Sequence, residues 1–452
     1  MPESHSDPQN AGLDALLSGQ DWKRRAALWC GALMVALAAM LFTRASDAAF
    51  AVFKQVEHHS PYWAFLLTPT VFAILAWVTS RGLQSTRGSG IPQVIAALDM
   101  PQAEREQHLS LKVSAAKLCL TVGGLLGGAS IGREGPTVHI GAGIMHAFGK
   151  RFGFGNDHDS ARFMLAGGAA GIAAAFNTPL AGVVFAIEEL SGTFEHRFSG
   201  TLLTAVLVGG VASLALLGNY TYFGRVSASL PLGQGWLAIL LCGSLCGFAG
   251  GGFSRMLLAV VDGKPRWLGR LRSRYPVVMA ACCGLILAIL GVYFSAGAFG
   301  TGYEQARSLV QGHAMVGQDF GVVKLAANLV SYLAGIPGGL FSPALAVGAG
   351  LGHNIAQLLP GVDASAIVLL GMSAYLTGVT QAPLTSAVIS MELTDSSDLL
   401  LPILATVLIA RGCSALVCHV PVYKALAMRL LPAPTSKPVP EPEPANPPVE
   451  PT

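Results

Sequence analysis

The sequence predicts an all-α integral membrane protein with many tilted and discontinuous helices arranged in two repeated halves. Its 452 residues are 52% hydrophobic and 12% charged, whereas a soluble protein carries about 25% charged residues. The mean hydropathy is +0.55. Many apolar runs are shorter than the ~20 residues that a straight helical crossing needs. Such short runs favour helices that end inside the protein, where other protein groups satisfy their backbone.

The apolar runs give the expected helices in chain order. A first helix over 26–41 is short for a straight crossing, whereas the second, over 62–80, is long enough to span. After a break at Arg87–Pro92, Gly and Pro divide the remaining apolar sequence into short segments. These are 113–128, 136–148, 163–176, 179–190, 202–217, 236–253, 277–294, 322–333, 343–359, 366–377, 383–393 and 400–416. Residues 218–233 and 262–275 are polar enough to be loops, and five basic residues in the second indicate the cytoplasmic side.

The ends of the chain differ from the apolar middle. Residues 1–22 are polar and lack the pattern of a secretory signal, and Lys23, Arg24 and Arg25 directly precede the first apolar run. By the positive-inside tendency this predicts a cytoplasmic N-terminus. We expect a membrane domain over 23–431 and a disordered Pro-rich tail over 432–452. The net charge of +3 is too small to indicate a nucleic-acid partner, and no cysteine has zinc-type spacing, so we expect neither metal nor cofactor.

Two halves of the chain resemble each other, over about 26–217 and 234–417. The segment from Pro136, P-T-V-H-I-G-A-G-I, is echoed 207 residues later from Pro343, P-A-L-A-V-G-A-G-L. Pro179 with a Glu nine residues on, Glu188, is echoed 204 residues later by Pro383 and Glu392. Duplicated halves with broken helices place substrate sites near the membrane midplane, between the repeats.

The repeat fails at two acids. Glu134 corresponds to Phe341, and Glu189 corresponds to Leu393. Symmetry therefore accounts for the helix ends, and chemistry is the better account of the two unmatched acids. An ionisable residue at membrane depth is a functional-site candidate by default.

Three breaks pair glycine with a proline that can begin a helix. They are Gly88-Ser89-Gly90-Ile91-Pro92, Gly132-Arg133-Glu134-Gly135-Pro136 and Gly339-Leu340-Phe341-Ser342-Pro343. Free N–H groups and the positive dipole end of a helix favour an anion at its N-terminus. If the three ends converge, they form an anion site without a bare cation, which lets the ion leave again.

At these residues the chain resembles the CLC family of chloride channels and chloride/proton antiporters, over about residues 25–430. The resemblance implies two inverted repeats, a homodimer with one pore per subunit, and a multi-pass position in the inner (plasma) membrane. It also implies that Glu134 is the gating glutamate, whose carboxylate takes an anion position when ionised and leaves it when protonated. The implied chloride-binding residues are Ser89, Leu340, Phe341, Tyr423, Arg133 and Gly135.

Whether the chain is an antiporter or a passive channel depends on Glu189. This residue resembles the inner glutamate with which bacterial-type antiporters hand protons toward the gate, so Glu189 and Glu134 are the expected proton-transfer residues. The resemblance favours chloride/proton exchange, with chloride and protons as the transported partners. The alternatives are a passive chloride channel and a helix-end role for Glu189. Glu188 is more simply structural, because Glu392 repeats it.

Ser89, Lys117 and Tyr423 also allow other interpretations. Ser89 beside an intramembrane His139 suggests an intramembrane serine protease, but no base is specified within reach of the hydroxyl, and the place two residues before Ser89 is Arg87 rather than Gly. We therefore expect no enzyme activity. Lys117 either raises the local potential for anions or pairs with an acid. Tyr423 could instead be an interfacial anchor.

Overall fold

The computed structural model describes residues 19–191, 199–218, 221–226, 228, 230, 232–313 and 316–431. The predicted 1–22 segment lies mostly outside these residues, and the 432–452 tail lies wholly outside them. Within the described residues the fold is helical, and its only β-type pairs are the isolated bridges Gly88–Pro337 and Gly132–Gly339. The predicted all-α membrane fold is confirmed.

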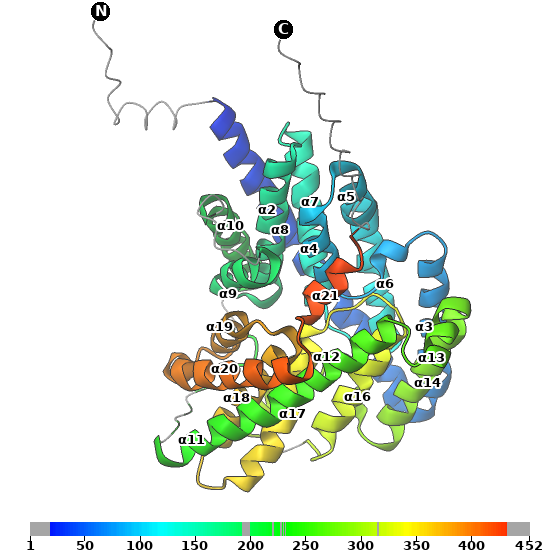
Figure 1. Cartoon of the computed structure of the whole chain (residues 1–452), viewed down its shortest axis with the longest axis vertical. Helices are drawn as coiled ribbons and strands as arrows, with labels where there is room; N and C mark the ends of the chain where they lie inside the picture. Colours follow the sequence, from blue (N-terminus) through cyan, green and yellow to red (C-terminus); the bar gives the residue numbers. More distant parts are fainter. Residues whose placement is uncertain are drawn as a thin grey trace, which may run out of the picture.

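Most of the first half of the chain lies in the upper part of the molecule in Figure 1, whereas Ala64–Ser80 lies lower, at the right edge. This half contains α2 (Gly19–His59), α3 (Ala64–Ser80), α4 (Ile91–Asp99), α5 (Gln102–Leu109), α6 (Leu111–Leu126), α7 (Glu134–Arg151), α8 (Asp157–Phe176), α9 (Pro179–Phe185), which continues as a wider π-turn over Ala186–Ser191, and α10 (Ser199–Leu217).

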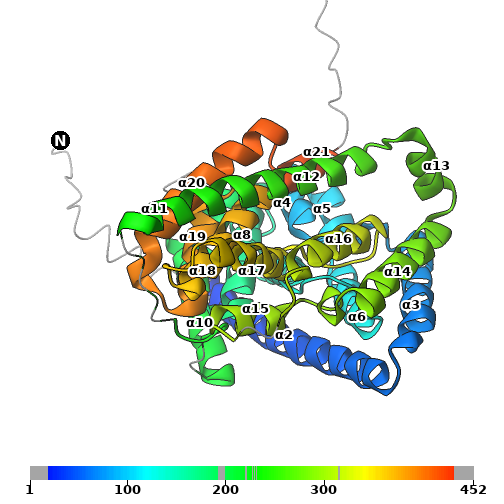
Figure 2. The ribbon, with the colours of Figure 1, turned by 90° about the horizontal axis from the view of Figure 1, so that it is seen from below.

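The second half follows below it. It contains α11 (Leu232–Leu241), α12 (Gly247–Val261), α13 (Arg266–Arg274), α14 (Pro276–Tyr293), α15 (Tyr303–Val310), α16 (Phe320–Leu333), α17 (Phe341–Leu358), α18 (Ala364–Thr380), α19 (Pro383–Thr394), α20 (Leu400–Val417) and α21 (Val422–Met428). A π-turn over Cys242–Cys246 joins α11 to α12. Viewed from below, α17 and α18 lie in the middle, with α12, α16, α14 and α20 around them (Figure 2).

The two halves are related by an inverted repeat. Its core pairs are α7 with α8 and α17 with α18, and both pairs pack at glycines. A Cβ at Gly141 would strike the Gly167 carbonyl, and a Cβ at Gly348 would lie 2.5 Å from the Gly371 carbonyl. Because α7 and α17 meet at their N-termini and run away from each other, the halves point in opposite directions (Figure 1).

Reciprocal contacts across the centre show the same relation. The Gly132 N–H donates to the Gly339 carbonyl, and the Gly339 N–H donates to the Gly132 carbonyl, both at 2.7 Å. Glu188 accepts hydrogen bonds from the N-terminus of α19, while its repeat partner Glu392 accepts them from the N-terminus of α9. Each half donates to the other the same hydrogen bonds that it accepts from it, so the two halves are related by an approximate two-fold axis.

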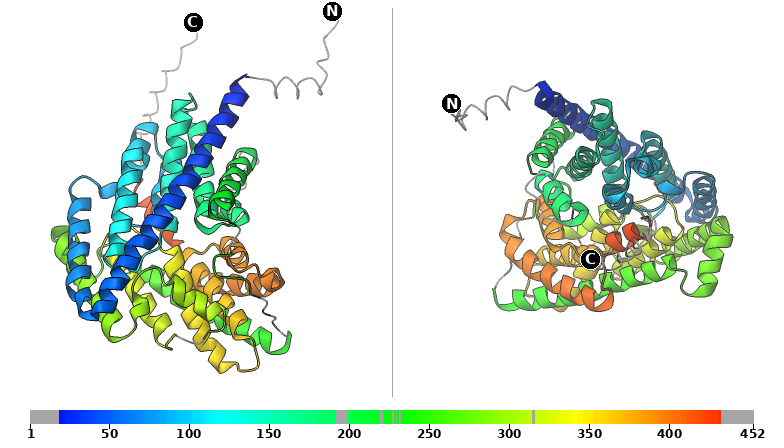
Figure 3. Two further views of the ribbon diagram at one scale, coloured as in Figure 1. Left: turned by 180° about the vertical axis from the view of Figure 1, so that it is seen from behind. Right: turned by 45° about the horizontal axis from the view of Figure 1, so that its top comes forward.

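Two helix predictions were wrong. The first helix is not the short 26–41 segment but α2, which is 41 residues long and crosses the back of the molecule diagonally (Figure 3). Its extension carries charged residues that the apolar criterion rejected, including Asp47, which pairs with Arg133. The expected loop at 262–275 contains α13, a nine-residue helix with no buried residue. Its basic residues made the segment look like a loop, although Leu268 and Leu271 are partly buried against the core.

In the part of the chain that the structure describes, six helical stretches are long and apolar enough to cross a membrane: Trp22–His59, Pro61–Ser80, Gln102–Leu126, Gly235–Val261, Pro276–Tyr293 and Ser397–Val417. In contrast, α7, α8, α17 and α18 lie inside the shell that other helices provide, and most of α8 and α18 is buried. The N-termini of α7 and α17 are buried, and the predicted site residues Glu134 and Phe341 lie there.

Candidate functional site

Three helix N-termini converge at the centre of the molecule, those of α4, α7 and α17. The loop before α4 is tied to the second half, because the Gly88 N–H donates to the Ile336 carbonyl at 3.3 Å and the Gly338 N–H donates to the Gly88 carbonyl at 3.2 Å. The loop before α7 is tied to the loop before α17 through Gly132 and Gly339. The first N–H groups of a helix have no intrahelical partner, so this arrangement directs free donors to one region.

Glu134 begins α7 and is 1% exposed. Its side chain crosses to the other repeat, where the Ser342 hydroxyl donates to Oε1 and the Ser342 N–H donates to Oε2 at 3.4 Å. Ser342 lies in the first turn of α17, so the carboxylate occupies the anion position at that N-terminus. The structure thus brings Glu134 to the break that contains Leu340 and Phe341.

Ser89 lies on the opposite side of Gly135. Its side chain is fully buried, and a Cβ at Gly135 would collide with its Oγ. Gly88 and Gly90 flank it with φ of 71° and 110°, a left-handed backbone that glycine adopts without a steric penalty. Within the described part of the chain the Ser89 Oγ has no hydrogen-bond partner, and the His139 Nε2 is bonded to the His108 carbonyl. The structure therefore does not form the Ser–His pair that a serine protease needs.

Tyr423 closes the other side of this region. It is fully buried on α21, its ring stacks on Phe341 with centroids 6.2 Å apart and planes 4° from parallel, and its hydroxyl faces Ser89. Like the Ser89 Oγ, the Tyr423 hydroxyl makes no hydrogen bond to a described residue. Two buried hydroxyls without partners lie beside free helix N-termini, and a buried polar group of this kind needs a partner. An anion that accepts from both would satisfy them.

A bidentate ion pair holds α21 in place. Arg429, just after this helix, donates to both carboxylate oxygens of Asp262 at 2.7 and 2.8 Å, and Asp262 caps the end of α12. These hydrogen bonds from Arg429 hold the pKa of the Asp262 carboxyl below its usual range.

Arg133 does not pair with its neighbour Glu134. Its guanidinium donates to Asp47 of α2 at 2.6 Å, and this pair borders an outer cavity of about 400 Å³ that Tyr222 and Thr301 also line. Asp47 was not found from the sequence, because nothing within the apolar α2 pattern indicates its partner 86 residues away.

Glu188 and Glu189 leave α9 in different directions. Glu188 accepts from the Leu384 and Thr385 N–H groups at 3.1 and 2.6 Å, so it caps α19. Glu189 has no hydrogen-bond partner of this kind among the described residues, and it borders a cavity of about 690 Å³. Glu188 lines the same cavity, but only Glu189 interacts electrostatically with Tyr423, so Glu189 lies near the central site.

Two fully buried lysines occupy equivalent positions in the two repeats, and the sequence analysis did not recognise them as a pair. Lys117 and Lys324 are 207 residues apart, which is also the offset of the repeated proline segments. Lys324 donates to three carbonyls, Ala298, Phe299 and Gly300, at 3.1, 3.3 and 2.7 Å. Lys117 has no partner among the described residues, and a Cβ at Gly90 would lie 3.1 Å from its Nζ.

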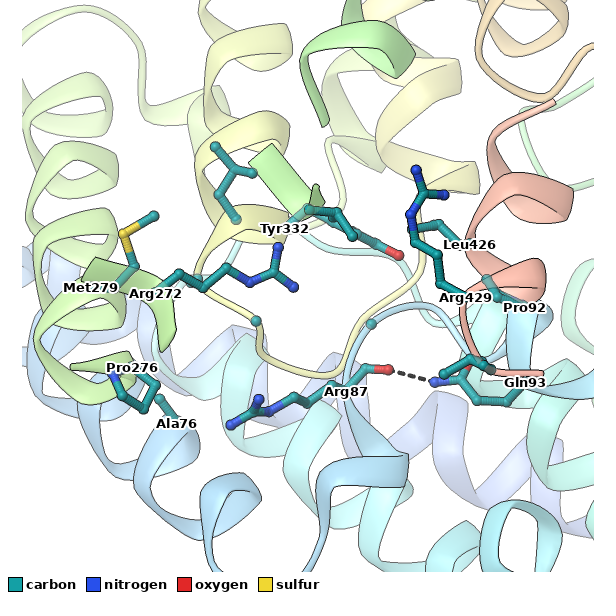
Figure 4. A pocket seen from close by; sticks show the side chains of 16 residues that line it. Ala76, Arg87, Pro92, Gln93, Arg272, Pro276, Met279, Tyr332, Leu426 and Arg429 are labelled. Carbon is teal, nitrogen blue, oxygen red and sulfur yellow. Dashed lines mark hydrogen bonds between the residues drawn. The ribbon is translucent and has the colours of Figure 1, made fainter. Parts of the chain in front are cut away.

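A cavity of about 180 Å³ opens beside Gly88, one residue from Ser89 (Figure 4). Arg87, Arg272 and Arg429 come to it from three different segments, with Tyr332 between them. Arg272 of α13 lines this cavity on one side, and Gly88, the neighbour of Ser89, lines it on another. Basic residues other than those in α13 were not expected here from the sequence.

The comparisons with known proteins agree with this geometry. The family model for the voltage gated chloride channel matches residues 71–415, which is more than half of the chain. Among solved structures, a slow cyanobacterial Cl⁻/H⁺ antiporter is similar with a TM-score of 0.77 and 23% identity over 90% of this chain and 97% of that one. A eukaryotic CLC transporter gives 0.73 and 22% over 90% and 74%, and a CLC-type fluoride/proton antiporter gives 0.76 and 21% over 88% and 97%. At these identities the structures show the shared fold, and the family model shows membership: this multi-pass membrane protein belongs to the voltage gated chloride channel (CLC) family.

Proposed function

We propose that this protein exchanges chloride for protons across the membrane. Glu134 would alternate between two states, one in which its carboxylate occupies the anion position and one in which it carries a proton. The observation that carries the proposal is the placement of the Glu134 carboxylate on the Ser342 N–H and hydroxyl at the start of α17. A chloride ion and this carboxylate compete for the same donors. Protonation removes the negative charge from Glu134, so the side chain leaves and chloride takes its place.

Chloride would bind between the Ser89 and Tyr423 hydroxyls, with the free N–H groups of Leu340 and Phe341. Arg133 and Gly135 would add backbone N–H groups near Glu134. All donors except the two hydroxyls belong to the backbone, so the ion meets partial charges only and can leave quickly. We infer that Glu189 delivers protons, because it borders a cavity and is near enough to Tyr423 to interact with it electrostatically. We also propose a homodimer in the inner (plasma) membrane, to be tested by light scattering in detergent and by cross-linking in membranes.

The test is simultaneous measurement of chloride and proton flux by purified protein in liposomes. A chloride gradient should drive protons uphill in the wild type. Glu134→Gln should lose proton movement and keep chloride movement, because a neutral amide neither carries a proton nor competes as an anion. Glu189→Gln should also lose proton movement. Glu304→Gln, an exposed acid that pairs with Lys54, is the control and should remain coupled.

Each competing function has its own outcome in the same assay. Chloride flux that never moves protons uphill would leave a passive channel. Proton movement driven by fluoride but not by chloride would replace chloride as the substrate. Labelling of Ser89 by a fluorophosphonate probe would revive the serine protease interpretation, and we expect none.

A further inference from the structure

The cavity beside Gly88 contains two positive charges that nothing in the described structure neutralises. Arg87, Arg272 and Arg429 line it, and no acidic residue does. Arg429 is paired with Asp262 through two hydrogen bonds, so its charge is accounted for. Neither Arg87 nor Arg272 forms an ion pair with any carboxylate among the residues that the structure describes.

The side chains are held so that they face the cavity (Figure 4). Arg87 donates to the Ser80 hydroxyl at 2.8 Å, its Nε is buried without a partner, and its carbonyl is fixed by the Gln93 amide at 2.6 Å. Tyr332 stands between Arg272 and Gly88, and a Cβ at Gly88 would lie 3.0 Å from its hydroxyl. Donors from three segments thus converge on one space with no acceptor for the Arg87 Nε.

The two free guanidiniums also repel each other. Burial lowers the pKa of the Arg87 guanidinium, and the nearby charge of Arg272 lowers it further. Burial lowers the pKa of Arg272 as well. Like charges held together in a half-buried place are unfavourable unless an anion lies between them.

The chemistry of the donors indicates what that anion is. Guanidinium groups present a planar fork that matches phosphate bidentately, whereas the central chloride region uses backbone dipoles that let a halide leave. The cavity volume of about 180 Å³ is several times the ~30 Å³ that a water molecule occupies in the liquid. The cavity therefore has room for a tetrahedral oxyanion between the side chains that line it.

We propose that a phosphate group binds between Arg87 and Arg272 and blocks access to the central site from this side. Its source is either free inorganic phosphate or the headgroup of an anionic lipid. The arginine-rich α13 places this mouth on the cytoplasmic side by the positive-inside tendency. The blocking effect rests on the proposed anion transport, whereas phosphate binding itself does not.

Calorimetric titration of inorganic phosphate into the purified protein in uncharged detergent tests binding directly. The wild type should bind phosphate, and Arg87→Gln and Arg272→Gln should each weaken it at least tenfold. Arg87→Lys keeps the charge but loses the fork, and should also bind more weakly. Arg270→Gln removes an equal charge from α13 at a residue that lines only the adjacent cavity, which Arg87 and Arg272 also border, and should leave phosphate affinity unchanged. Chloride titration of the same samples identifies any variant that has not folded.

Flux assays separate the two sources of phosphate. In vesicles of zwitterionic lipid, added phosphate should slow chloride flux of the wild type but not of Arg272→Gln. If phosphate does not bind in detergent, yet vesicles with phosphatidylglycerol slow the wild type and not Arg272→Gln, the ligand is the lipid headgroup. The proposal is overturned if neither source has an effect, or if Arg270→Gln changes the response as much as Arg272→Gln. Loss of proton coupling alone would refute antiport and leave the titration result standing.

Discussion

Glu134 and Ser342 belong to different repeats, yet their side chains are hydrogen-bonded to each other at the central site. The repeat places Phe341 where Glu134 would stand, so the second half supplies a helix N-terminus without an acid of its own. The acid of the first half, Glu134, binds at that N-terminus instead. One side chain therefore joins the two halves, and in the proposed exchange it competes with chloride for the same donors.

Ser342→Ala should make chloride bind more tightly. The mutation removes the hydroxyl that donates to the Glu134 carboxylate, and a hydrogen bond to a charged group contributes about 1.5–3 kcal/mol. With the carboxylate held less firmly, chloride affinity measured by calorimetry at neutral pH should rise by about tenfold. Ser386→Ala is the control, because that buried hydroxyl donates to its own helix at Ala382 and should leave chloride affinity unchanged. An unchanged affinity in Ser342→Ala would contradict competition at α17.

Gly135→Ala should disrupt the central site without unfolding the chain. A Cβ at this position collides with the Ser89 Oγ, so either the serine or the start of α7 has to move. We expect chloride affinity to fall at least tenfold by calorimetry while the protein stays monodisperse. Gly252→Ala is the matched control, since a Cβ there meets no atom within 4 Å. Equal affinities for the two variants would show that Ser89 does not need its present place.

At the residue scale, the sequence predicted which breaks come together, but not the side chains that link them. Glycine, proline and the unmatched acid were sufficient to select the three breaks and Glu134, whereas the roles of Ser89, Phe341 and Tyr423 followed from the family resemblance. The Ser342 hydroxyl and Asp47 were missed, because their partners are 208 and 86 residues away and no local pattern marks such contacts.

At the element scale, α9 and α19 cap each other. Glu188 binds two N–H groups at the start of α19, and Glu392 binds two at the start of α9. Each carboxylate satisfies helix donors that otherwise lack partners, and each interacts favourably with a helix dipole. The sequence repeat had indicated a structural role for Glu188, and this exchange supplies it.

Glu188→Gln and Glu392→Gln should destabilise the protein to a similar degree. Each loses a charge-assisted contact with a helix N-terminus, for which about 1 kcal/mol is expected. Thermal unfolding followed by tryptophan fluorescence should show similar decreases in Tm, with chloride and proton flux still coupled below the transition. Loss of coupling in Glu188→Gln, without a loss in Glu392→Gln, would instead place Glu188 in the proton pathway.

The link between α12 and α21 should weaken in acid. Because Arg429 lowers the folded-state pKa of Asp262, the ion pair stabilises the fold above the ordinary Asp pKa of about 3.9, and this contribution is lost as the pH falls through the lower folded-state value. Asp262→Asn should therefore lower the Tm at pH 7 and have little effect near pH 3. Since Asp262 is partly exposed, we expect at most about 1 kcal/mol. Asp395→Asn, at an exposed pair with Arg225, is the comparison variant.

Helix boundaries were predicted best where proline begins the helix, as for α9, α14 and α19. They were predicted worst where charge interrupts the apolar pattern. α2 continues through Arg44, Asp47 and Lys54 to His59, and none of the nine residues of α13 is buried. The ion pair of Asp47 with Arg133 helps to fix α2, and hydropathy does not register such a contact.

At the scale of the whole molecule, the two repeats have matching backbone conformations, but their charged side chains make different contacts. The glycine-flanked loop around Ser89 has a counterpart around Thr301, with positive φ at Gly300 and Gly302 as at Gly88 and Gly90. Lys324 closes the second loop by donating to three carbonyls. In the first loop the Arg87 and Gly88 carbonyls bind Gln93 and Gly338 instead, so Lys117 is left without them.

This inequality predicts opposite effects for two equivalent substitutions. Lys324→Met leaves three buried carbonyls without a donor and should destabilise the fold by at least about 2 kcal/mol. Lys117→Met removes a buried charge that has no described partner, so the Tm should stay the same or rise. Thermal unfolding of the two variants, side by side, checks the comparison. A larger loss for Lys117→Met would mean that its ammonium has a stabilising partner.

The paired glycines Gly132 and Gly339 also have a consequence for biogenesis. More than two hundred residues separate the two peptide groups that clasp each other at the heart of the protein. While the ribosome is still making the second half, Ser342 is absent, so Glu134 lacks both of its hydrogen-bond donors and the N-terminus of α17 is missing from the central site. We expect a nascent chain truncated before residue 339 to insert into the bilayer and yet bind no halide, so that ion recognition is acquired late in synthesis.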